Sequence, residues 1–376
     1  MAVRLTHILY FLLLIYPTSL LGGNMLYGNI GIYIYMLCSL YIIFFSVCEL
    51  INFKSFRISY DYLVIVSFLF LVFKVCYTYN PTYLREAILL TTTFLFFQHN
   101  SRRKILNIFY VFLFFSSISF VLYLISFLIS LDLLIEDTSN HKALLGRSLA
   151  DTKTDYINYG NLLLNRSDGV RDFIRFSSHF LEPSFLWFFG LLFYQIRAFR
   201  IVQLIVLWSG IAYFGAIAVG LSSAYYFRSF KSSVLICLLI FVSTYLFSDI
   251  ISTKVLQFDY MSNKGFFLIP EISLYGSANE IERVFVGLGI FLISMKYGVM
   301  GLLLYLLWIR KIFYLKNKIT DNAQAVVLIA LLIYFFKMPF FIAHFYFVFI
   351  LSREAVKINR TKHIINSAIK STVLNK

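Results

Sequence analysis

The sequence predicts an all-α polytopic membrane protein with about 11–12 transmembrane helices, one pair of them short or broken, and two large extracytoplasmic loops. Of the 376 residues, 60% are hydrophobic and only 14% are charged, and the mean hydropathy is +0.81. The apolar residues form long runs, and basic residues gather in short clusters between them. A soluble domain has no place for so much apolar surface. We therefore expect residues 1–376 to form a single integral membrane domain.

The apolar runs give the positions of the expected helices. Several are shorter than the roughly 20 residues that a helix needs to cross a bilayer, so their limits are approximate. The first run follows Arg4 and has some features of a signal peptide, but we interpret it as the first span because so many spans follow. The runs lie at about 7–22, 28–48, 60–78, 84–98, 105–131, 176–196, 201–221, 232–249, 297–315, 323–336 and 340–352.

The basic clusters predict the orientation of the chain. Lys and Arg are concentrated in the cytoplasmic loops of membrane proteins, so we expect cytoplasmic N- and C-termini. All clusters lie on the cytoplasmic side of the membrane only under two conditions. Residues 201–230 must form a bent pair of short helices that turns near Gly220-Leu-Ser-Ser223, and the last apolar stretch must split into two spans at Lys337-Met-Pro339. The clusters are Lys54/Arg57, Arg102-Arg103-Lys104, Arg197/Arg200, Arg228/Lys231, Arg310 to Lys318, and the tail from Arg353.

The charge count favours this topology. The expected cytoplasmic segments hold 20 basic and two acidic residues, whereas the external segments 132–175 and 250–283 hold nine basic and 11 acidic residues. A wrong topology would rarely produce so strong a bias of basic residues toward the cytoplasmic side. The bent pair at 201–230 contributes to this bias, because it places Arg228 and Lys231 on that side.

Two external loops are long, namely 132–175 and 250–296. Long loops in a compact protein are usually functional or disordered. Both carry charges of either sign with Tyr and Phe interspersed, and this mixture favours folded, sugar-facing caps over tails.

The stretch from Arg175 through His179 and Glu182 to Pro183 is the first candidate site. These three ionisable residues are spaced four and three apart, so on a helix they would share one face. We expect Pro183 to bend or start the helix there, because proline fixes φ and supplies no donor. Ionisable residues at the mouth of a membrane helix indicate function by default. The alternative is an interface anchor in which Arg175 snorkels and pairs with Glu182.

Other ionisable residues are candidates of lower weight. Arg283 ends the second external segment and, with Arg175, could clamp a pyrophosphate, because the planar fork of arginine suits phosphate oxygens. His344 lies in an apolar run, where a lone histidine is more often a satisfied core residue. We expect the remaining ionisable residues near the ends of runs to snorkel to the interface, namely Lys74, Arg85, Glu86 and Lys337.

Several kinds of chemistry have no support in the sequence. The four cysteines lie within apolar runs without metal-ligand spacing, so we predict neither a disulfide nor a metal site. Nucleotide-binding loops and the motifs of zinc proteases and serine hydrolases are absent. The net charge of +15 reflects cytoplasmic clusters rather than a nucleic-acid surface.

Together these features resemble the O-antigen and capsular repeat-unit polymerases of the Wzy type, within the wider polymerase/ligase superfamily. The resemblance covers about 132–350 and rests on four elements. They are Arg175…His179-x-x-Glu182-Pro-Ser184 opening a span, Gly220-Leu-Ser-Ser223 in a broken helix, Arg283 followed by Lys296-Tyr-Gly298-Val-Met-Gly301, and a final span with His344. Many relatives have Ser-Arg at the broken helix, whereas here Ala224 follows Ser223.

The resemblance implies metal-independent glycosyl transfer, without a cofactor, at the outer face of the bacterial inner membrane. Donor and acceptor would be oligosaccharide repeat units on undecaprenyl pyrophosphate, in contact with membrane lipid, and a chain-length regulator protein is a further expected partner. Glu182 or His179 would act as base, and Arg175, Arg283 and His344 would bind pyrophosphate or glycan. The alternatives are an O-antigen ligase that transfers glycan to lipid A core, a flippase for lipid-linked oligosaccharide, and a structural subunit.

Overall fold

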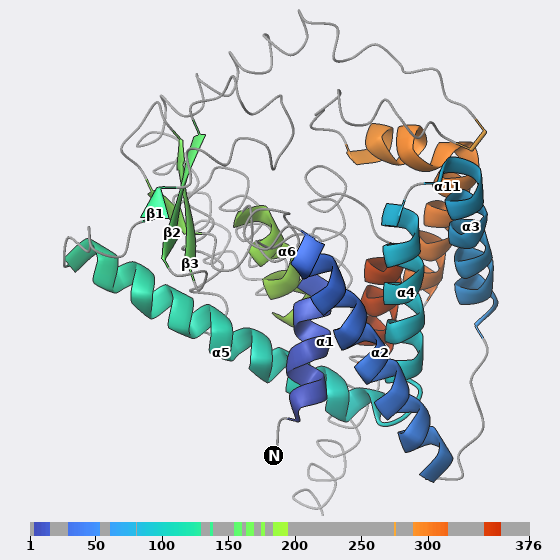
Figure 1. The fold of residues 1–376 in the computed structure, drawn as a ribbon, viewed down its shortest axis with the longest axis horizontal. Coiled ribbons are helices and arrows are strands. Elements are labelled where there is room, and N and C mark those ends of the chain that lie inside the picture. The colour runs from blue at the N-terminus through green and yellow to red at the C-terminus, as the bar shows by residue number, and fades with distance from the viewer. Residues whose placement is uncertain are drawn as a thin grey trace, which may run out of the picture.

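The computed structural model describes residues 4–15, 29–52, 61–79, 81–128, 136–137, 154–159, 163–168, 174–176, 183–194, 274–275, 289–314 and 342–354. Within these ranges the chain is mainly helical, with one small sheet between the fifth and sixth helices (Figure 1). The helical class is therefore confirmed for this part of the chain. The expected spans at 201–221, 232–249 and 323–336, and with them the bent pair, lie outside the described residues.

The first five helices coincide with the first five apolar runs. They are α1 (Leu5–Ile15), α2 (Asn29–Asn52), α3 (Tyr62–Thr78), α4 (Pro81–Phe96) and α5 (Ser101–Leu128). The boundaries of α3 follow from local chemistry, since the Asp61 side chain accepts a hydrogen bond from the Leu63 amide at 3.0 Å and caps the first turn. Tyr79 ends the helix in the left-handed conformation and donates its amide to the Val75 carbonyl at 2.9 Å.

Two of the described helices are long and apolar enough to cross a membrane, judged by length and composition: Tyr33–Asn52 within α2 and Ser101–Leu122 within α5. Large apolar side chains also project from the surface of α2 and α3. Leu37 is 66% exposed, Phe44 69% and Leu69 60%. A soluble monomer rarely exposes so many large apolar side chains together, and lipid would cover them without cost.

The segment after α5 contains a four-stranded antiparallel sheet, which the all-α prediction did not include. Its strands are β1 (Glu136–Asp137), β2 (Thr154–Tyr159), β3 (Leu163–Asp168) and β4 (Ile174–Phe176). They pair in the order β1-β2-β3-β4, so each strand lies beside its neighbour in sequence. Such consecutive antiparallel pairing needs only short connections. Part of the first long segment is thus a small folded unit at the far end of α5.

Three later helices complete the described fold: α6 (Pro183–Tyr194), α11 (Gly289–Tyr314) and an unlabelled helix at 342–354. As predicted, α6 begins at Pro183, where the missing amide of proline costs no intrahelical bond. Helix α11 starts at Gly289, eight residues before the predicted run at 297. It also contains a break at Gly298, which the sequence analysis did not predict.

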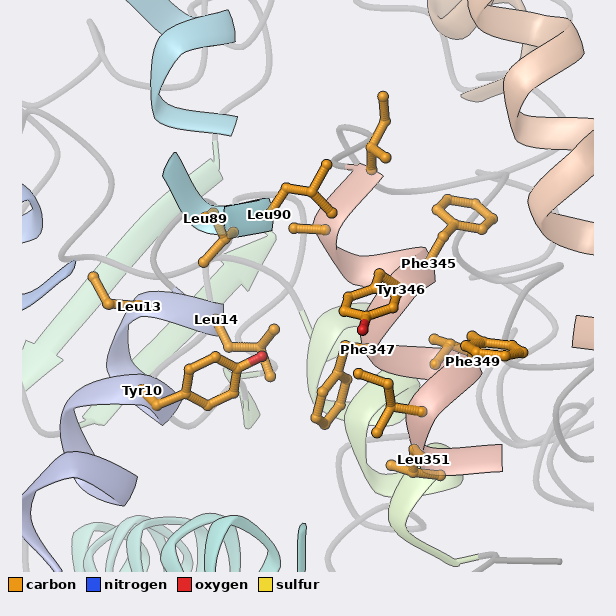
Figure 2. Packing of buried hydrophobic residues seen from close by; sticks show 14 of the residues in the cluster. Tyr10, Leu13, Leu14, Leu89, Leu90, Phe345, Tyr346, Phe347, Phe349 and Leu351 are labelled. Carbon is orange, nitrogen blue, oxygen red and sulfur yellow. The ribbon is translucent and has the colours of Figure 1, made fainter. Parts of the chain in front are cut away.

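The core forms where α1, α4 and the helix 342–354 converge (Figure 2). Tyr10 of α1 stacks on Phe96 with ring centroids 4.5 Å apart, and its hydroxyl donates to Thr93 Oγ1 at 3.1 Å. Phe347, on the helix 342–354, packs against the same tyrosine with centroids 6.5 Å apart. Residues far apart in sequence thus close one apolar core around a satisfied polar group.

One end of the helical bundle gathers the charged helix termini. Three contacts define this end: Lys104 with Glu49, Lys311 with Asp61, and Ser101 with Glu354. The first joins the start of α5 to the end of α2, and the second joins the start of α3 to the end of α11. The third joins the start of α5 to the end of the helix 342–354. Arg4, at the start of α1, lies at the same end, because His7 in the next turn contacts Asn107 near the start of α5 at 3.1 Å. We call this the charged end. The sheet lies away from it (Figure 1), and Tyr275 packs on Tyr77 near the opposite end of α3.

Candidate functional site

Arg175 belongs to a strand of the small sheet. It is the middle residue of β4, and its register partner in β3 is Arg166. Like charges directly opposite each other on an antiparallel pair are destabilising. The sheet thus places two arginines of the first long segment at paired register positions. In the sequence, Arg166 is one of many charged residues in the segment 132–175, because its pairing with Arg175 depends on the sheet.

The helical face proposed for Arg175, His179 and Glu182 is wrong for Arg175. That residue lies in β4, and the helix begins only at Pro183, so the spacing of four between Arg175 and His179 does not place them on one helical face. The error has a physical origin, since the antiparallel sheet supplies hydrogen-bond partners for the backbone and ends before the proline. His179, Glu182 and Arg283 lie outside the described residues.

His344 lies inside the bundle, on the helix 342–354. It is 1% exposed, and its Nε2 lies 2.9 Å from the carbonyl oxygen of Leu14 in the last described turn of α1. A carbonyl only accepts, so Nε2 carries the proton and donates. The ring also meets Phe189 of α6 edge-on, with centroids 6.1 Å apart. His344 thus connects α1 and α6, and its role in binding substrate stays a prediction.

A second group of polar side chains is buried between α3, α4 and α11, away from the charged end. Lys74, Glu86 and Tyr297 are each 0% exposed, and Tyr83 is 1% exposed. The Tyr297 hydroxyl donates to the Glu86 carboxyl group. The Lys74 ammonium lies 4.9 Å from the centre of the Tyr83 ring and donates to the Tyr275 carbonyl oxygen at 2.5 Å. Four polar groups from three helices thus form one buried cluster, and one of them, Lys74, contacts residue 275 of the second long segment.

The expectation that Lys74 and Glu86 snorkel to the interface is wrong, because both side chains are fully buried. Each lies within one or two turns of a helix end, and that position favoured the snorkelling interpretation. The structure instead covers both residues with α11 and residues 274–275. Burial of ionisable groups is costly unless they are paired and hydrogen-bonded, so this cluster is a stronger candidate for a functional element than the sequence indicated.

In the sequence, this cluster is indicated by the presence of Lys74 and Glu86 inside apolar runs. An intramembrane ionisable residue suggests function by default, but the partners Tyr297 and Tyr275 lie more than 190 residues away in the chain. No local pattern identifies them. In the sequence, Tyr297 stands out only as part of the Lys296-Tyr-Gly298 run.

No protein-family model, no curated protein and no solved structure matches the chain.

Proposed function

We propose that the chain is a glycosyltransferase of the bacterial inner membrane that polymerises undecaprenyl-pyrophosphate-linked oligosaccharide repeat units into O-antigen or capsular polysaccharide. The observation that carries the proposal is the path from β4 to α6. Arg175 lies opposite Arg166 in the sheet, and eight residues later Pro183 opens the apolar helix α6. In the sequence the candidate acid–base residues His179 and Glu182 lie between β4 and α6, and cations together with a proton acceptor are what departure of a pyrophosphate requires.

The membrane location rests on three supports. They are the helices Tyr33–Asn52 and Ser101–Leu122, the exposed apolar surface of α2 and α3, and the charged end. Because that end includes Arg4 and the basic clusters of α5 and α11, we assign it to the cytoplasm, with both termini. The sheet and residues 274–275 then belong to the outer face, where lipid-linked glycans are polymerised.

The proposed reaction breaks one bond and forms another. A hydroxyl of the acceptor repeat unit attacks the anomeric carbon of the donor, and the bond from that carbon to the lipid pyrophosphate breaks. Glu182 or His179 accepts the hydroxyl proton, and Arg175, Arg166 and Arg283 neutralise the departing pyrophosphate. With three guanidinium groups the leaving group is neutralised without a metal ion.

The test uses the full chain in a strain whose own copy has been deleted. Arg175→Ala, Arg166→Ala, Arg283→Ala and Glu182→Gln are expected to abolish or strongly shorten the polysaccharide ladder on a gel. Arg103→Ala, which removes an equal charge from an exposed site at the charged end, should leave the ladder unchanged. Normal ladders from all four site variants, at normal amounts of protein in the membrane, would refute the site.

The related ligase reaction is the second candidate, because it shares the lipid pyrophosphate donor. The deletion strain separates the two activities. Loss of a polymerase leaves core capped with a single repeat unit, whereas loss of a ligase leaves uncapped core. Accumulation of lipid-linked units on the cytoplasmic face would instead indicate a flippase.

A further inference from the structure

Residues 274 and 275, in the second long segment, are attached to the bundle through their main chain. The Leu274 carbonyl accepts from the Met300 amide at 3.2 Å, and the Tyr275 carbonyl accepts from Lys74 Nζ at 2.5 Å. The Tyr275 ring also packs on α3, with centroids 5.1 Å from Phe73 and 5.8 Å from Tyr77. Two adjacent carbonyls of one segment are thus held by donors from two different helices.

The break in α11 supplies the first of these donors. Gly298 has φ 70° and ψ −169°, a conformation that is essentially restricted to glycine. A new helical segment starts after it, and the first four amides of any such segment lack partners within the helix. Met300 carries one of these amides, and it donates to Leu274. The break therefore creates the binding position for the main chain of the second segment.

The hydrogen bond from Tyr297 to Glu86 holds the residue just before the break. Gly301 permits this arrangement, because a Cβ atom at that position would lie 2.0 Å from the Cβ atom of Tyr297. The Tyr297 ring also meets Tyr83 edge-on at 5.6 Å. The break at Gly298 is thus fixed by the contacts of Tyr297 with α4 before it, and by Gly301 after it, which leaves room for the Tyr297 side chain.

Lys74 supplies the second donor. A lysine that is 0% exposed is expensive to keep inside a bundle, yet its ammonium donates to a backbone carbonyl 201 residues away. Methionine or leucine would fill the same space without that cost. What the lysine adds is a fixed attachment point for residues 274–275.

We propose that Lys74, Glu86, Tyr297 and the break at Gly298 form a clamp that holds residues 274–275 of the second long segment against the bundle for the transfer reaction. Arg283 follows Tyr275 by eight residues. The four residues are positioning residues, since they act through the segment that they hold. The role in transfer rests on the proposed function, whereas the clamp itself is a statement about structure.

Cross-linking tests the clamp without reference to activity. In a full-length chain with its native cysteines replaced by serine, Tyr77→Cys and Tyr275→Cys place thiols where the two rings now meet. Because both clamp bonds end on backbone carbonyls, these substitutions leave the clamp in place. A short bis-thiol reagent is applied to membranes, and the linked peptides are quantified by mass spectrometry.

Lys74→Met is expected to lower the cross-linked fraction at least fivefold. Lys311→Met, the same change at the charged end, should leave it within twofold of the parent. If Lys74→Met unfolds the protein, Lys74→Gln, which is polar but too short to reach the carbonyl, serves in its place. An unchanged fraction in the folded variant would overturn the clamp.

Polysaccharide from the same variants, without the added cysteines, tests the role in transfer. Reduced or shortened polymer from Lys74→Met supports positioning, and a normal ladder together with a lost cross-link would overturn it. If deletion of the whole chain leaves the polysaccharide unchanged, the proposed function fails, and the cross-linking result still decides the clamp.

Discussion

The hydroxyl of Tyr297 donates a hydrogen bond to the carboxyl group of Glu86, and both side chains are fully buried. The two residues are 211 positions apart, on α11 and α4. The bond therefore joins the second half of the chain to the first at the level of the Gly298 break.

Tyr297→Phe should destabilise the protein, because it removes the donor and leaves a buried acceptor without it. Loss of such a hydrogen bond costs about 1–3 kcal/mol. The measurement is the temperature at which detergent-solubilised protein loses its monodisperse chromatographic peak. Tyr62→Phe, at a site that is 83% exposed, is the control. Equal midpoints for the two variants would contradict the importance of the bond.

Gly301→Ala should be more damaging than Tyr297→Phe. The added Cβ atom would lie 2.0 Å from the Cβ atom of Tyr297, and neither atom can move without the backbone. Overpacking of this kind costs roughly 1–3 kcal/mol, occasionally more. Met300→Ala, where the side chain is 44% exposed, is the neighbouring control. The same thermal assay should rank Gly301→Ala lowest, and a midpoint equal to that of Met300→Ala would show that the bundle accommodates the methyl group.

Lys104→Met should destabilise the charged end. Lys104 Nζ lies 2.5 Å from Glu49 Oε2, with side-chain exposures of 8% and 11%, and it also donates to the Phe96 carbonyl at 2.7 Å. Removing one partner of a buried ion pair costs about 3–5 kcal/mol, because the other charge is left uncompensated. Thermal midpoints should therefore fall further for Lys104→Met than for Arg103→Met, whose side chain is exposed.

A double variant separates lost pairing from lost packing at this site. Lys104→Met combined with Glu49→Gln should recover part of the stability, because the uncompensated carboxylate is gone. No recovery would assign the loss to the other contacts of Lys104.

The orientation of the bundle is tested by thiol labelling in intact cells. In the background without native cysteines, Tyr79→Cys reports the end of α3, where the side chain is 89% exposed, and Arg103→Cys reports the charged end. A membrane-impermeant maleimide should label position 79 in intact cells and position 103 only after the inner membrane is opened. The reverse pattern would place the charged end outside and refute the assignment of both termini to the cytoplasm.

The positions of the first five helices were predictable because the signals are local. An apolar run with Asp61 before it and Tyr79 after it contains its own start and stop, and Pro183 marks the start of α6 from within the sequence. The small sheet was less predictable. Its short strands in a polar segment carry little apolar periodicity, and the partnership of Arg166 with Arg175 exists only through the pairing of β3 with β4.

The sequence by itself determined that the chain is apolar, that its first five helices lie in its first five apolar runs, and which ionisable residues stand inside apolar runs. The tertiary structure alone decided what those residues contact. Lys74 and Glu86 are buried and not at an interface, because α11 and residues 274–275 pack over them. Apolar content and helix caps act within a few residues, whereas the burial of a charge depends on which distant segment covers it.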